Sequence, residues 1–188
     1  WFPQTAADIT QRIAALDTLI AKEPDAAFDL LDKLVHVGFD HATPTARPIW
    51  RDDDAVAGYG ATPAERHRML VAAADRLIAC SKNYPTRIVR LIGKITIFDQ
   101  DRINVALGFA NQFTKPGVAD EDRETIRAAL RKHIHRHRNY DKARGKALDK
   151  KLKAIEDIHK RLVPIDLVIR HRWLFTDGRP ELPAVVRH

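Results

Sequence analysis

Apolar residues recur every three or four positions along most of the chain, the spacing that places side chains on one face of an α-helix. This pattern predicts a first helix over residues 6–22 and a second over residues 24–38. Pro24 would stand in the first turn of the second helix and Gly38 at its C-terminal end. The tight connection predicts an antiparallel hairpin. The two expected buried stripes are Ile9, Ile13, Leu16 and Ile20, then Phe28, Leu31, Leu34 and Val35.

The periodicity is lost between residues 39 and 61, where two prolines, two glycines and three consecutive aspartates predict a long loop between helical hairpins. A loop of this length usually packs on its own side chains or has a function. A third helix is expected after Thr62, because Thr62, Pro63 and Glu65 have the order of an N-cap, a first-turn proline and a capping-box partner. Its expected stripe is Leu70, Ala73, Leu77 and Cys80.

Two further elements are expected between residues 83 and 117. In the first, the run KITIF at 94–98 is rich in β-branched residues and leaves a short strand as the alternative to helix. Helix is favoured because an isolated strand would have no partner. Asp99 is expected to cap the second element, and Lys115, Pro116 and Gly117 are expected to end it. The stripes are Ile88, Leu91, Ile92 and Ile95, then Ile103, Ala106 or Leu107, Ala110 and Phe113.

The last third of the chain predicts two long helices and a short one. Asp120 or a neighbour would cap a helix over 121–138, and Gly145 would separate it from a helix over 147–162. Pro164 would end that helix before a short last one over 165–175, followed by a coil. The stripes are Ile126, Leu130 and Ile134, then Leu148, Leu152, Ile155 and Leu162.

These patterns predict an all-α protein of seven to eight helices in antiparallel hairpins. An irregular bundle and a short helical-repeat array of the HEAT or tetratricopeptide type both fit. Only 7% of the residues are aromatic and glycine is scarce, which favours helices over a β-sandwich or barrel. We expect residues 1–188 to form a single α-helical domain. Because the chain opens at Trp1 and Phe2, we interpret it as a fragment of a larger protein.

A single cysteine and the lack of a long apolar run favour a reducing, cytoplasmic location without a membrane partner. Cys80 lies on an apolar stripe with no histidine near it in sequence, so an inert core thiol is expected. No glycine-rich phosphate loop, nucleophile elbow or metalloprotease motif occurs, so we expect no cofactor and no enzymatic activity in this segment.

The positive charge is concentrated in residues 127–161. That segment has thirteen Lys and Arg residues against four Asp and Glu residues, a net charge of +9; since the chain carries +7, the rest carries −2. Such a segment is a candidate nucleic-acid-binding surface, although solvated helix faces rich in Lys and Arg are common. The candidate residues are Arg131, Lys132, Arg136, Arg138, Lys142, Arg144, Lys146, Lys150, Lys151 and Lys153.

Three alternating histidines within the basic segment suggest a metal site. His133 and His137 would share one helix face, but His135 would point away and no Cys, Asp or Glu completes the ligand shell locally. We therefore expect no metal, and we interpret His133 and His137 as half-buried residues at the edge of the core.

The loop over residues 39–61 offers two further candidates. The consecutive aspartates 52–54, with His41 and Arg51 nearby, lack the spaced oxygens of a calcium loop and would repel one another in one pocket. Trp50 with Arg47 and Arg51 is a better candidate for protein docking, because Trp and Arg are enriched at interface hot spots. Burial of Trp50 against its own hairpin is the alternative.

Several phrases of the chain resemble a known class of helical segment. They are ATPTARPIWRD (42–52), RKHIHRHRNYD (131–141), LDKKLKAIEDIHKRLVPIDLVIRHRWLF (148–175) and LFTDGRPELP (174–183). Together they resemble C-terminal α-helical segments of very large bacterial multidomain proteins that join an effector domain and an NTPase to helical repeats in antiphage defence. The resemblance implies a sensor, scaffold or oligomerisation region whose partners are other domains or subunits of a larger assembly. A helical interaction module is thus the first hypothesis, and a nucleic-acid-binding helical domain is the alternative.

Overall fold

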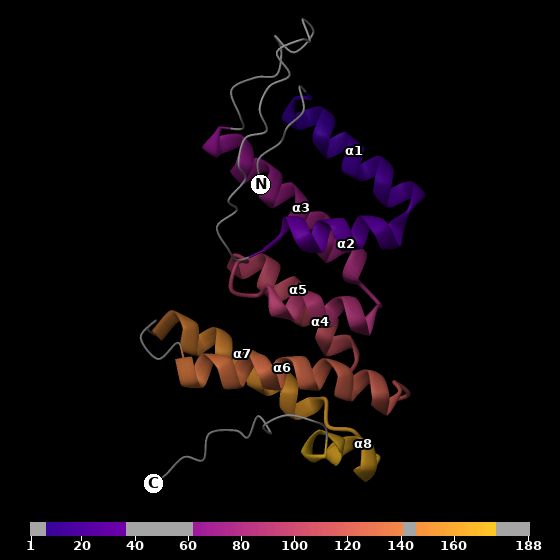
Figure 1. Cartoon of the computed structure of the whole chain (residues 1–188). Helices are drawn as coiled ribbons and strands as arrows, with labels where there is room; N and C mark the ends of the chain where they lie inside the picture. Colours follow the sequence, from indigo (N-terminus) through magenta and orange to yellow (C-terminus); the bar gives the residue numbers. More distant parts are fainter. Residues whose placement is uncertain (1–6, 37–61, 141–145, 176–188) are drawn as a thin grey trace, which may run out of the picture. The chain divides into compact units, whose positions relative to one another are not determined.

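The computed structural model describes residues 7–36, 62–140 and 146–175, and the side chains at 139–140 and 146–151 are not described either (Figure 1). Within these ranges the chain forms eight α-helices and one short 3₁₀ helix, and no β-strand is present. The predicted all-α class is therefore confirmed. The chain divides into two compact units, Trp1–Cys80 and Ser81–His188, which we call the N-terminal and C-terminal units. The expected loop over 39–61 lies outside the described residues.

The N-terminal unit contains helices α1 (Ile9–Lys22), α2 (Pro24–Leu34) and most of α3 (Pro63–Ser81). The start of α3 has the predicted capping box, because the Glu65 amide donates to Thr62 Oγ1 at 3.2 Å and Glu65 Oε2 accepts from the Thr62 amide at 2.9 Å. The Thr62 amide, together with the Thr62 hydroxyl, which donates to the same Oε2 at 3.0 Å, lowers the pKa of Glu65. A second capping box starts α1, where Asp8 and Gln11 exchange bonds of 2.8 and 2.9 Å.

The predicted hairpin in the N-terminal unit is confirmed, because α1 packs against α2. Most of the expected stripe positions are buried, but the buried face of α3 differs slightly from the prediction. Leu70 and Cys80 are half-buried, whereas Met69, Ala74 and Ile78 lie in the core together with the predicted Ala73 and Leu77.

A bidentate ion pair joins α1 and α3. The guanidinium of Arg76 donates from Nε to Asp17 Oδ1 at 2.6 Å and from Nη2 to Asp17 Oδ2 at 2.7 Å. The bonds from Arg76 lower the pKa of Asp17.

The C-terminal unit contains α4 (Pro85–Gly93), α5 (Gln100–Gln112), α6 (Asp120–Tyr140), α7 (Lys146–Arg161), α8 (Leu167–His171) and the 3₁₀ helix η2 (Arg172–Leu174). Helix α6 packs against α4, α7 and α8, and α5 packs against α4 and α7. The predicted cap of α5 is confirmed, since Asp99 Oδ1 accepts from the Arg102 amide at 2.9 Å. Gly117, in the turn predicted to end α5, has a φ of 83°, which glycine adopts readily.

Residues 94–98 form successive turns instead of the predicted helix or its strand alternative. The Ile97 amide donates to the Lys94 carbonyl at 3.0 Å and the Phe98 amide to the Ile95 carbonyl at 3.3 Å. Ile95 and Phe98 are buried. The β-branched run therefore places apolar side chains in the core through i to i+3 bonds, without needing a partner strand.

The core of the C-terminal unit follows the predicted stripes closely. Every predicted position on α4 and α6 is buried. On α7 Ile158 is buried in addition to the predicted Ile155, whereas the predicted Leu152 is half-buried and the side chain of Leu148 lies outside the described residues. The hydrophobic core of the unit consists of Ile88, Leu91, Ile92, Ile95, Phe98, Ile103, Ala106, Leu107, Ala110, Ile126, Leu130, Ile134, Ile155, Ile158, Leu162 and Ile169.

Candidate protein-docking surface

Large apolar side chains are exposed along the short segment that follows α7. The exposed fractions are 81% for Ile165, 65% for Leu167, 74% for Val168, 45% for Leu174 and 86% for Phe175. We call these five residues the C-terminal apolar surface. Single exposed apolar residues are ordinary in soluble proteins, but several within so short a segment are a feature of interaction sites.

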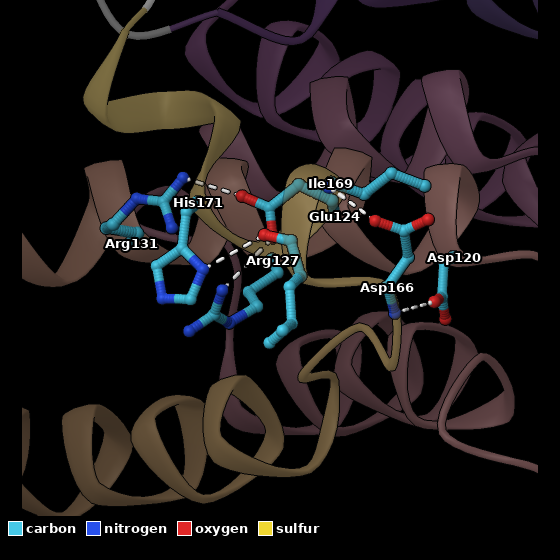
Figure 2. Close-up of polar contacts among 8 residues, drawn as sticks. Asp120, Glu124, Arg127, Arg131, Asp166, Ile169 and His171 are labelled. Carbon is cyan, nitrogen blue, oxygen red and sulfur yellow. Dashed lines mark hydrogen bonds and ion pairs between the residues drawn. The ribbon is translucent and has the colours of Figure 1, made fainter.

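A capped and anchored helix presents this surface. Asp166 caps α8 through Oδ1, which accepts from the Val168 amide at 2.7 Å and from the Ile169 amide at 3.1 Å. The amide of Asp166 in turn donates to Asp120 Oδ2 at 2.7 Å (Figure 2). Asp120 is the first residue of α6, so its carboxylate ties the start of α8 to the start of α6.

Buried contacts hold the rest of the segment in place. The side chain of Ile169 is buried, and α8 packs on α6. The guanidinium of Arg131, from α6, lies over the Trp173 ring at 4.6 Å from its centroid. A cation–π contact of this kind is worth about 0.5–2 kcal/mol, depending on desolvation. The exposed apolar side chains therefore belong to a segment with a defined position on α6.

A carboxylate on α6 fixes Arg131 for this contact. Glu124 Oε1 accepts from Arg131 at 2.8 Å, and Glu124 Oε2 accepts from Arg127 at 3.1 Å (Figure 2). The exposed fractions of the three side chains are only 13% for Glu124, 14% for Arg127 and 10% for Arg131. We call these three residues the α6 charge cluster. Its charges are largely removed from water, so each arginine depends on the shared carboxylate.

His159 on α7 lies in the field of the same cluster. Burial, the positive charges of Arg127 and Arg131, and that of Lys160 lower the pKa of His159 to about 4. The imidazole is therefore neutral near pH 7, and the cluster gains no further positive charge from it.

The predicted nucleic-acid-binding residues have different environments. Arg131 is buried in the α6 charge cluster. Arg138 Nη2 pairs with Glu156 Oε1 on α7 at 2.5 Å. Lys132, Arg136 and Lys153 are exposed. The side chains of Lys142, Arg144, Lys146, Lys150 and Lys151 lie outside the described residues. Two of the ten candidates thus hold the fold together, and three are exposed to solvent.

The histidines of the basic segment are more buried than predicted. The exposed fractions are 9% for His133 and 5% for His137, whereas both were expected at the edge of the core. Their ring centroids lie 4.3 Å apart with a 58° tilt, while His135 is half-buried. The described part of the chain contains no group of three His, Cys, Asp or Glu residues placed to hold a metal ion.

The predicted docking residues Arg47, Trp50 and Arg51 lie outside the described residues, so that hypothesis stays a prediction. Sequence reasoning missed the C-terminal apolar surface, although a signal was present. Apolar residues occupy 165, 167, 168 and 169, a run too dense for one face of a short helix, so part of it must face solvent or a partner.

No α-helix among the described residues is both long and apolar enough to cross a membrane. Comparison with models of protein families found no match for the chain. Comparisons with curated proteins and with solved structures also found no significant match.

Proposed function

We propose that the chain is a non-catalytic helical interaction module that docks onto other domains or subunits through the C-terminal apolar surface. The observation that supports this most is the exposure of five large apolar side chains on a capped segment anchored to α6. A disordered apolar tail would lose conformational entropy on binding, whereas an ordered segment has already lost much of that entropy on folding.

The free energy available from this surface is sufficient for specific binding. Complete burial of one large apolar side chain contributes about 1.5–3 kcal/mol. Because association also has an entropic cost, only part of the sum across five side chains would appear as affinity. Phe175 is the most exposed of them, so it has the most apolar area to lose to a partner.

The wider setting of the proposal rests on the resemblance of residues 42–52, 131–141 and 148–183 to helical segments of large bacterial proteins. In that setting the chain is a scaffold or sensor module of a cytoplasmic antiphage-defence protein, and any enzymatic domain lies elsewhere in the full-length chain. A helical segment with an unburied apolar surface suits contact with neighbouring domains or with other copies of the assembly.

Site-specific photo-crosslinking tests the proposal. A benzophenone amino acid replaces Phe175 in the chain, expressed in the cells from which it comes, and a control carries it at the exposed Asn104 on α5. We expect a discrete adduct from position 175 only, which fragment mapping assigns to one surface of the partner. Val168→Asp should abolish the adduct, and the matched Val105→Asp, on an exposed apolar residue of α5, should not. Equal adducts from positions 175 and 104 would contradict the proposal.

A second function keeps support from the exposed cations of the basic segment. Lys132 and Arg136 are one turn apart on α6, and Lys153 on α7 is also exposed. A nucleic-acid-binding domain would show affinity for labelled DNA or RNA that falls steeply with salt, because phosphate contacts release counterions. Replacing these three residues with Glu would then remove the binding, while the α6 charge cluster would stay intact.

A further inference from the structure

We infer that the partner of the C-terminal apolar surface is an acidic amphipathic helix, with apolar side chains flanked by carboxylates. This inference rests on the proposed docking function and adds the chemistry of the partner. It follows from the charges that surround the exposed apolar residues and from the kind of backbone that presents them.

Positively charged residues precede the exposed apolar residues in sequence and also lie among them. Lys160 and Arg161 end α7, while Arg170 and Arg172 belong to α8 and η2, and all four are exposed. The single acidic residue between positions 160 and 175 is Asp166. Its carboxylate keeps its charge while it caps α8, so the stretch from 160 to 175 carries four Lys and Arg residues against one Asp. With the neighbouring carboxylates of Asp120 and Asp157 included, the surface combines exposed apolar groups with a rim of modest net positive charge.

The rim cations are weakly engaged within the molecule. Lys160 Nζ lies 4.0 Å from Asp157 Oδ1, and both side chains are largely exposed, which makes this a pair of little strength. Within the described part of the chain, no ion pair engages Arg170 or Arg172. A partner carboxylate could approach these side chains without breaking a strong existing contact. Opposite charges at the rim of an interface speed association and exclude wrongly charged partners.

The backbone geometry favours a helical partner. The described residues contain no β-strand, so no sheet edge in them could bind an extended peptide by adding a strand. The exposed apolar side chains stand on and around a short helix and a 3₁₀ turn, in which the amides of Val168, Ile169 and Arg170 are engaged internally. Recognition must then come from side chains, which is how the apolar face of an amphipathic helix is bound.

An anionic membrane surface would also attract a basic and apolar segment, but the structure favours protein. Interfacial helices that bind membranes insert a continuous apolar face, often with Trp or Phe. Here α8 spans only five residues, and Asp166 lies between the exposed Ile165 and Leu167. Trp173 is held under Arg131 and is not available to insert. A protein partner can leave room for the Asp166 carboxylate, whereas a lipid surface would bury it.

Binding of designed peptides to the whole 188-residue chain tests this inference. The probe is a labelled peptide of about three heptads, with Leu on one face and Glu at the flanking positions. One control peptide replaces every Glu with Lys, and another replaces every Leu with Ser. We expect the acidic Leu peptide to bind at least tenfold more tightly than either control and to weaken as salt rises. In the chain, the double variant Arg170→Glu with Arg172→Glu should weaken its binding by about tenfold or more.

The outcomes separate this inference from the function on which it rests. Equal binding of the acidic and basic peptides, or no binding of either while the crosslink at position 175 still forms, would overturn the acidic partner and leave the docking function standing. Loss of the crosslink as well would overturn both. Binding of the chain to anionic phospholipid vesicles, with no binding to the acidic peptide, would replace the protein partner by a membrane. The double variant must keep the parent melting curve, because both arginines are exposed.

Discussion

Replacing Glu124 with Gln tests whether the α6 charge cluster stabilises the C-terminal unit. The substitution keeps the size of the side chain but removes the negative charge that Arg127 and Arg131 share. Both arginines would then stay in a poorly hydrated place without a counter-charge, because their exposed fractions are only 14% and 10%. Removing one member of a buried ion pair is much more costly than removing one member of an exposed pair.

The expected magnitude follows from the contacts that Glu124 makes. A hydrogen bond to a charged group is worth about 1.5–3 kcal/mol, and Glu124 accepts one at 2.8 Å and one at 3.1 Å. The amide oxygen of Gln can still accept one of them, so we expect a loss of about 2–3 kcal/mol in the free energy of unfolding. For a chain of this size, each kcal/mol lowers the Tm by about 2–4 °C.

Chemical unfolding followed by circular dichroism measures this loss, and Asp17→Asn is the matched control. Asp17 also accepts two bonds from one arginine, but its side chain is 56% exposed. An exposed pair contributes about 0–1 kcal/mol, so the control should unfold nearly as the parent does. If Glu124→Gln also lies within about 0.5 kcal/mol of the parent, the cluster is not structural and the account of Arg131 is wrong.

Three other perturbations have defined outcomes. Leu130→Asp places a charge at a fully buried position and should destabilise the C-terminal unit by several kcal/mol, so an unchanged melting curve would refute the assigned face of α6. Because the pKa of His159 is lowered to about 4 from 6.5, the stability that its neutral form contributes is present above pH 6.5 and is lost as the pH falls toward 4. The free energy of unfolding, measured at a series of pH values, should therefore vary less over this range for His159→Gln than for the parent. Asp166→Ala removes the cap of α8 at a cost of about 0.5–2 kcal/mol. Hydrogen exchange should then be faster at the Val168 amide, and the photo-crosslink at position 175 should be lost.

Much of the fold follows from local rules that act within one or two helical turns. The cap at Thr62 with Glu65 and the cap at Asp99 depend on residues three positions apart, so they were predicted correctly. The buried faces of α4 and α6 follow from apolar spacing in the same way. Both the favoured helix and the alternative strand at 94–98 were wrong, because i to i+3 turns already bring Ile95 and Phe98 into the core.

The prediction of a basic nucleic-acid-binding surface shows where local rules stop. A count of Lys and Arg treats Arg131, Arg138 and Lys132 alike, although the structure uses the first two in contacts with Glu124, Trp173 and Glu156. Arg138 pairs with Glu156, and the Arg131 guanidinium lies over Trp173. Both of these partners belong to other elements of the chain than α6. Whether a cation is free to bind a phosphate is therefore decided by packing between helices.

From the amino-acid sequence alone come the all-α class, the helix positions and most of the helical faces that are buried, because capping and apolar periodicity act over a few residues. The tertiary structure alone shows that α8 is tied to α6 through Asp120, with the five residues of the C-terminal apolar surface exposed. The anchor joins residues 46 positions apart, and burial depends on how much neighbouring surface covers a side chain. The dense apolar run indicates locally that some side chains must be exposed, but only the packed chain shows which ones are covered and where the segment is anchored.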